Sequence, residues 1–89
     1  MTDTESAALD TRRRRLLFRA THRGTYENDL MIGGFVRDRL ATFDAVELGE
    51  LESLLEQPDP LLADWLTGRR PIPPDAAPML RRIREALVR

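Results

Sequence analysis

The stretch HRGTYE, residues 22–27, offers most of the polar chemistry that could mark a functional site. It contains the only His and the only Tyr of the chain, and Arg23 and Glu27 stand four residues apart on either side of Gly24. A guanidinium and a carboxylate at this spacing can form a local ion pair at a helix junction. They can also bind a partner protein and fix its orientation, because Arg makes bidentate hydrogen bonds. The spacing alone leaves both interpretations open.

Residues that carry out catalysis are scarce in this chain. All fourteen basic residues are Arg, so neither a Schiff-base lysine nor a P-loop can form. One His and no Cys leave no ordinary zinc cluster and no disulfide. A Ser–His–acid triad would need His22 with Ser6 or Ser53, and Ser6 lies in an expected tail. We therefore predict a protein that is not an enzyme, with no catalytic residues and no metal or cofactor of its own.

Helical patterns must position the junction, because no strand-like alternation of apolar and polar residues occurs. Apolar residues recur at helical spacing in five segments, which are approximately residues 10–22, 25–41, 44–57, 59–68 and 75–89. Gly24 follows the first segment and Gly68 closes the fourth, as Gly in the left-handed conformation does. We predict an all-α fold: a small single-domain five-helix bundle over residues 10–89, preceded by a flexible N-terminal tail, residues 1–9.

Local signals mark the starts of the last three helices. Asp44, with Glu47 three residues later, has the pattern of a capping box. Asp59 is expected to cap the fourth helix, and Asp75 is expected to cap the fifth. Trp65 falls on the apolar side of the fourth helix, which predicts that it packs in the core rather than stacking on a ligand.

The second helix combines a weak point with a polar side. Gly33 and Gly34 lower its helix propensity, which predicts a kink or the close approach of another backbone. Glu27, Gly34 and Asp38 fall on one side of this helix, away from most of its large apolar residues. A small residue beside a carboxylate, with Arg23 entering at the junction, is suited to protein docking.

The net charge is only −1, but the charges are segregated along the chain. Arg12 to Arg15, with Arg19 and Arg23, make the start basic, every charge in residues 44–64 is acidic, and the end is basic again. One explanation is that oppositely charged helix faces attract one another across the bundle. The other is a polarised surface that steers a partner.

Two segments of the chain resemble one known family. Arg23-Gly24-x-x-Glu27 is similar to the RGxxE motif of the succinate dehydrogenase assembly factors that promote covalent flavin attachment. The stretch RGTYENDLMIGGF and the stretch LLEQPDPLLADWLTGRRP resemble that family's conserved segments in order and separation. The resemblance covers about residues 12–88. Gly33 and Gly34 replace bulkier residues of the family, and Leu61 replaces an acid.

The resemblance implies a five-helix bundle and a partner, the flavoprotein subunit of succinate dehydrogenase, with the fumarate reductase flavoprotein as a second partner. In such complexes a His of the flavoprotein bonds to the 8α-methyl of FAD, and the factor holds that subunit in a favourable conformation. The resemblance makes Arg23, Gly24, Glu27 and Asp29 the docking residues. His22 has no such support and is expected to be an exposed junction residue.

No run of about 18 apolar residues occurs, so we expect no membrane insertion. The polar N-terminus is neither a secretory signal nor an Arg-rich transit peptide, and the chain has no Cys, which favours the cytoplasm (bacterial type) or, in a eukaryote, the mitochondrial matrix. We expect a monomer when the protein is free. Two alternatives stay open. Arg12–Arg15 could bind nucleic acid or an anionic membrane surface, although the net charge is negative and no aromatic residues interleave the run. An antitoxin-like antagonist of another protein is the second alternative. We expect no nucleic-acid binding.

Overall fold

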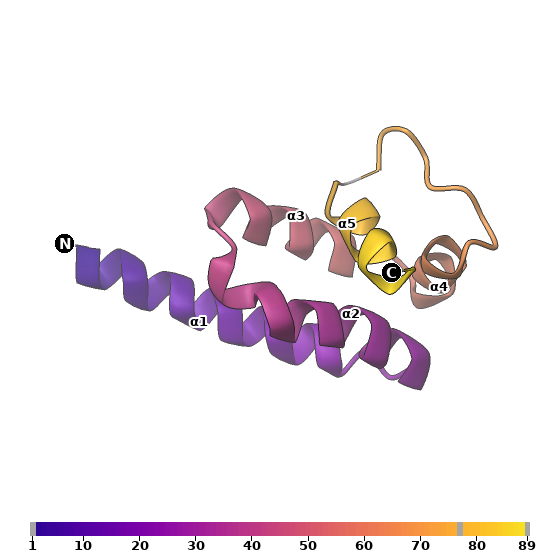
Figure 1. Ribbon diagram of the computed structural model, residues 1–89. Coiled ribbons are helices and arrows are strands. Elements are labelled where there is room, and N and C mark those ends of the chain that lie inside the picture. Colours follow the sequence, from indigo (N-terminus) through magenta and orange to yellow (C-terminus); the bar gives the residue numbers. More distant parts are fainter. Residues whose placement is uncertain (1, 77, 89) are drawn as a thin grey trace.

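The computed structural model describes residues 2–76 and 78–88. These ranges contain five α-helices and a short 3₁₀ turn, and they contain no strand (Figure 1). The elements are α1 (Thr2–Thr21), α2 (Tyr26–Arg39), the 3₁₀ turn η1 (Leu40–Thr42), α3 (Ala45–Leu55), α4 (Asp59–Thr67) and α5 (Pro78–Leu87). The predicted all-α fold of five helices is confirmed.

The helices pack in two parts that share one core. α1 and α2 lie side by side and run in opposite directions, and α3 packs along α1 (Figure 1). α4 and α5 pack against each other and both contact α2. None of the helices in the described ranges has both the length and the apolar character needed to cross a membrane.

The core is built from the apolar stripes that the sequence predicts. Its most deeply buried side chains include Leu16, Ile32, Val36, Phe43, Leu48, Leu51, Leu62, Met79 and Ile83. Trp65 is 9% exposed and belongs to the same cluster, so its predicted core position is confirmed.

α1 begins earlier than the sequence suggested. It starts at Thr2, so the expectation that residues 2–9 lie outside the helices is wrong. Residues 4–8 of this extension are exposed, which is why no apolar stripe revealed it. Once a helix has nucleated, each further residue adds a hydrogen bond at little cost, and Ala7 and Ala8 are good helix formers. Flexibility of this segment remains a prediction.

Two of the three predicted caps have a different role. Asp44 and Glu47 form the expected capping box, with hydrogen bonds of 2.9 Å in both directions. The N-cap of α4 is Pro58, however, and Asp59 is the first helical residue, where its carboxylate accepts a hydrogen bond from Arg23 of the α1–α2 junction. α5 begins at Pro78, three residues beyond Asp75, so the expected cap on Asp75 is also wrong.

The paired glycines of α2 differ in their surroundings. A Cβ on Gly33 would lie 2.9 Å from Cγ2 of Thr21 and 3.3 Å from the carbonyl oxygen of Ala20. Gly33 therefore lets the backbones of α1 and α2 approach, as one of the two expectations held. A Cβ on Gly34 would meet nothing within 4 Å.

The segregated charges meet across the bundle. Arg12 pairs with Glu52, Arg19 with Glu56 and Arg82 with Glu47, each at 2.7 Å. The hydrogen bond from Arg12 holds the pKa of Glu52 below its usual value. Attraction between helix faces thus accounts for much of the charge segregation. It does not account for every Arg, because Arg14 and Arg15 are exposed.

Candidate functional site

The junction between α1 and α2 is fixed by backbone interactions. The backbone of Gly24 has φ +94°, a conformation that residues with a side chain rarely adopt. A Cβ at Gly24 would meet nothing within 4 Å. Gly24 is therefore required by its backbone conformation rather than by lack of space. The backbone N–H of Arg23 donates to Oδ1 of Asp29 over 2.8 Å. Asp29 lies in the first turn of α2, so this hydrogen bond ties the junction to that helix.

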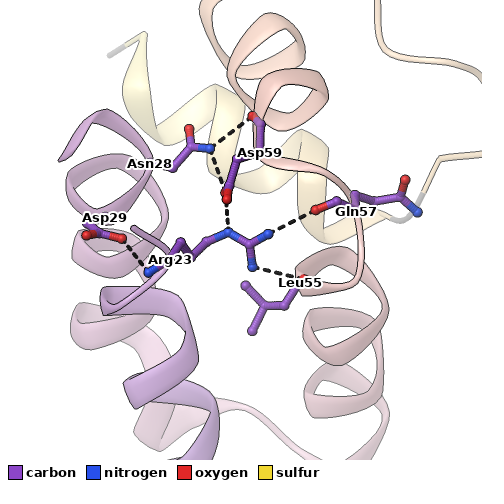
Figure 2. Close-up of polar contacts among 6 residues, drawn as sticks. All are labelled: Arg23, Asn28, Asp29, Leu55, Gln57 and Asp59. Carbon is purple, nitrogen blue, oxygen red and sulfur yellow. Dashed lines mark hydrogen bonds and ion pairs between the residues drawn. The ribbon is translucent and has the colours of Figure 1, made fainter. Parts of the chain in front are cut away.

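The Arg23 side chain crosses from this junction to the one between α3 and α4. Its Nε donates to Oδ1 of Asp59 at 2.5 Å. Its two Nη atoms donate to the carbonyl oxygens of Leu55 and Gln57, each at 2.9 Å (Figure 2). These carbonyls lie at the C-terminal end of α3, where backbone acceptors lack helical partners and the helix dipole favours a cation. Arg23 therefore satisfies the end of one helix while its own side chain is only 10% exposed.

Asn28 completes this network from α2. Its Nδ2 donates to both the carbonyl oxygen and Oδ1 of Asp59, each at 3.0 Å (Figure 2). Asn28 is 1% exposed, and among the described residues it is the one polar residue that is buried. Burial raises the pKa of the Asp59 carboxyl, but the hydrogen bonds from Arg23 and Asn28 outweigh it and the net pKa is lowered. We call these residues, Arg23, Asn28, Asp29 and Asp59, the Arg23 clamp.

Two members of the clamp were missed from the sequence. Asp59 was interpreted as a helix cap, because an Asp before a Pro at a helix start has that appearance. Asn28 offered a clearer signal, since it lies four residues before Ile32 and seven before Phe35, on the buried side of α2. A polar residue at such a position needs a hydrogen-bond partner inside the protein.

The structure separates the residues that the sequence grouped as docking residues. Arg23 pairs with Asp59, so the local Arg23–Glu27 ion pair suggested by the spacing is wrong. Gly24 and Glu27 are exposed, and Glu27 forms no ion pair within the described part of the chain. Arg23 and Asp29 instead direct their bonding groups to the junctions. A docking role for any of the four remains a prediction.

The surroundings of Glu27 include apolar side chains that the sequence did not single out. Tyr26 is 81% exposed and Leu30 is 57% exposed. At about 100° per residue, Leu30, Gly34 and Glu27 follow one another around the outer side of α2. We call Gly24, Tyr26, Glu27, Leu30 and Gly34 the docking face. His22 is exposed as expected, and its ring stacks on Phe18 with centroids 4.0 Å apart.

The chain belongs to the family described as flavinator of succinate dehydrogenase, whose model matches residues 14–87. This confirms the family resemblance predicted from the two motif segments. The match contains the whole Arg23 clamp and the docking face.

Individual relatives agree with the family match. The chain is 58% identical over 78 residues to the FAD assembly factor SdhE of Acetobacter pasteurianus, which covers 86% of this chain and 72% of the relative. It is 38% identical over 69 residues to the mitochondrial succinate dehydrogenase assembly factor 2 of Mycosarcoma maydis, covering 78% of this chain and 29% of that protein.

A third relative, the mitochondrial succinate dehydrogenase assembly factor 2-A of Drosophila mojavensis, is 38% identical over 69 residues. That alignment covers 75% of this chain and 44% of the relative. The chain thus spans less than half the length of these two mitochondrial relatives. No solved structure matches the chain significantly.

Proposed function

We propose that this protein binds the flavoprotein subunit of succinate dehydrogenase and promotes the covalent attachment of FAD to that subunit. The observation that carries the proposal is the family match over residues 14–87, which spans the clamp and the docking face together. The names of the relatives support it, since one is an FAD assembly factor and others are succinate dehydrogenase assembly factors.

The proposal assigns the bond-forming chemistry to the partner. The covalent bond would form between the 8α-methyl carbon of FAD and a ring nitrogen of a His of the flavoprotein. One methyl C–H bond and the imidazole N–H bond would break, and the isoalloxazine ring would take up the two electrons and two protons, which leaves the attached flavin reduced. This chain would act by holding the flavoprotein in a conformation that brings the two together, because correct placement of reacting groups removes a large part of a barrier. The chain would then be an assembly factor without catalytic groups of its own.

The residues of the motif differ in exposure, and we propose different roles for them. Glu27 is exposed and can bind a donor of the partner, while Gly24 leaves room for the partner's backbone. The clamp can serve the same interface indirectly, because Arg23 and Asp29 hold the junction from which Glu27 projects. We therefore place Gly24 and Glu27 in contact with the flavoprotein, and Arg23 and Asp29 as positioning residues.

Co-expression with the flavoprotein subunit tests the proposal. Covalently bound flavin is measured by in-gel fluorescence of the denatured subunit, without this protein, with the wild type, and with Glu27→Ala. Glu85→Ala is the matched control, because Glu85 is also exposed and lies on α5. We expect the wild type and the control to raise covalent flavin and Glu27→Ala to raise it much less. No increase by the wild type would overturn the proposed function, and full activity of Glu27→Ala would remove Glu27 from the docking face.

The remaining partner and location assignments are further proposals. We propose that the fumarate reductase flavoprotein is a second partner and that the free protein is a monomer. We propose that it acts in the cytoplasm of a bacterium, or in the mitochondrial matrix of a eukaryote; one relative is bacterial and another is named as mitochondrial.

No observation favours the alternatives to this function. Arg12 is paired with Glu52, and Nη2 of Arg13 donates to the carbonyl oxygen of Phe43 over 2.8 Å. Half of the Arg run is therefore engaged within the protein, which weakens its interpretation as a nucleic-acid or membrane surface. Nothing in the structure indicates an antitoxin.

A further inference from the structure

A shallow hollow lies beside the docking face, between α1 and α2. Its volume is about 280 Å³, and its lining residues are Arg14, Leu17, Phe18, Thr21, His22 and Arg37. The α1 residues stand three or four positions apart and so share one face of the helix. Arg37 is the contribution of α2. We call this feature the cationic hollow.

The cationic hollow has positive charge that the protein does not neutralise. Arg14 and Arg37 are exposed, and neither forms an ion pair with a carboxylate of the described residues. No Asp or Glu is among the lining residues. This differs from the side of α1 that faces α3, where Arg12 pairs with Glu52 of α3 and Arg19 pairs with Glu56, the C-cap of α3. Two guanidinium groups that line one hollow favour an anionic ligand, such as a carboxylate or a phosphate.

The hollow also carries an exposed aromatic surface. Phe18 is 63% exposed, and its ring is stacked on His22. Nδ1 of His22 lies 2.9 Å from the carbonyl oxygen of Phe18 and 3.0 Å from Oγ1 of Thr21, which holds the stack in place. Aromatic residues and Arg are enriched at protein interfaces, and a side chain that is already ordered loses little entropy on binding.

The size of the hollow argues for a protein ligand. Small-molecule sites usually enclose about 300–1,000 Å³ and bury most of the ligand. A hollow of about 280 Å³ with Phe18 open at its edge would leave a small molecule largely in solvent. A segment of a partner protein needs no enclosure, because the rest of the interface excludes water around it.

The hollow and the docking face share one side of α2. On α2, Tyr26, Leu30 and Arg37 lie within about 40° of one another around the helix axis. Tyr26 and Leu30 belong to the docking face, and Arg37 lines the hollow. A partner that covers Glu27 and Leu30 can therefore extend over α2 to Phe18 on α1.

We propose that the cationic hollow binds an acidic segment of the flavoprotein subunit, with a carboxylate held by Arg14 and Arg37 and a neighbouring apolar side chain on Phe18. This inference rests on the proposed function and adds a second contact to it. The docking face presents Glu27 and the hollow presents two Arg residues, so the two contacts have opposite charge and define one orientation of the partner.

Binding of the purified flavoprotein subunit by titration calorimetry tests the hollow. The main variant is Arg14→Glu/Arg37→Glu. The control is Arg15→Glu/Arg70→Glu, which changes the net charge equally at two exposed Arg residues that do not line the hollow. Measurements at about 0.1 M and about 1 M salt compare Debye lengths of about 10 Å and about 3 Å.

We expect the dissociation constant of the main variant to rise about tenfold or more at low salt, and that of the control to change less than about threefold. The excess of the main variant over the control should shrink at high salt. Phe18→Ala should also weaken binding, but with little dependence on salt. Arg14→Gln/Arg37→Gln, which removes charge without reversing it, should give an intermediate loss and serves if the reversed variant does not fold.

Three results would overturn the inference. Equal loss in the main variant and the control would mean that overall charge, not the hollow, matters. Unchanged affinity in the main variant alongside a loss in Glu27→Ala would remove the hollow while the proposed function stands. If the main variant binds a fluorescent DNA duplex less well than the wild type does, while its affinity for the flavoprotein is unchanged, the hollow would be assigned to nucleic acid instead.

Discussion

Arg23 and Glu27 belong to one short motif, yet they have opposite environments. The side chain of Arg23 is 10% exposed and all its bonds run inward, to Asp59 and to the end of α3. Glu27 is exposed, one residue into α2, and has no ion-pair partner in the described ranges. A motif that looks like a pair of surface charges thus consists of a structural cation and a free anion.

The difference teaches that motif spacing and physical partnership are separate matters. Arg23 and Glu27 are four residues apart in the sequence, but Gly24 redirects the chain between them. A guanidinium with five donors is best satisfied by several fixed acceptors, which the end of α3 and Asp59 provide. An exposed carboxylate costs nothing in stability and stays available for a partner.

Removal of the clamp cation should have the largest effect. Arg23→Ala leaves the Asp59 carboxylate without its cation and the last carbonyls of α3 without donors. Loss of one partner of a largely buried pair costs about 3 kcal/mol or more. We expect urea unfolding to show such a loss for Arg23→Ala and a change within about 0.5 kcal/mol for the exposed Arg70→Ala. Equal effects of the two substitutions would contradict the structural role of Arg23.

The clamp should also make stability depend on pH. The pKa of Asp59 is lower in the folded protein than its ordinary value, because its hydrogen bonds from Arg23 and Asn28 outweigh burial. Its contribution is therefore present above the unfolded pKa, near about 4, and is lost as the pH falls through the folded pKa. Glu47 and Glu52 have lowered pKa values too and act in the same direction.

Comparison with Asp59→Asn isolates the clamp from those two surface carboxyls. As the pH falls below about 4, the free energy of unfolding should decrease more steeply for the wild type than for Asp59→Asn. Acid-induced unfolding of the two proteins measures this difference. Parallel curves for the two proteins would show that Asp59 is not stabilised in its ionised form.

The glycines give effects of intermediate size and of both signs. Gly24→Ala should cost about 1 kcal/mol, because φ +94° strains any side chain although space is available. Gly34→Ala should stabilise by up to about 1 kcal/mol, since a methyl group meets nothing there and Ala favours the helix.

Gly33→Ala is the matched control for Gly34→Ala. Gly33 is adjacent to Gly34 in α2, but a Cβ at Gly33 would clash with Thr21 on α1. Thermal unfolding should therefore place Gly33→Ala below the wild type and Gly34→Ala above it. The same order for both substitutions would mean that helix propensity alone governs them.

Glu27→Ala should have the smallest effect on stability. Only its favourable position in the first turn of α2 is lost, which is worth about 0.3–1 kcal/mol. A larger loss of thermal stability would show that Glu27 has an internal partner and would remove the contrast with Arg23. Its effect on covalent flavin is a separate measurement and is expected to be large.

Much of the site's local structure was readable from short stretches of sequence. The capping box of Asp44 and Glu47 was predicted because both partners lie within one helical turn. The left-handed glycines Gly24 and Gly68 were predicted because few other residues adopt that conformation. The motif resemblance, the core position of Trp65 and the exposure of His22 were likewise visible without coordinates.

Only the tertiary structure decided what these residues touch. Arg23 and Asp59 stand 36 residues apart, and nothing local to Asp59 distinguishes a helix cap from the partner of a distant Arg. Likewise, the sequence grouped Arg12 to Arg15 as one run, whereas helix packing pairs Arg12 with Glu52 and leaves Arg14 facing the hollow. The chain by itself determined the five helices and those ends that depend on neighbours within one turn, such as the capping box at Asp44 and the glycines that follow α1 and close α4. The choice between a buried clamp and an exposed docking group depends on which helix ends meet in space, and that was settled by packing of the common core.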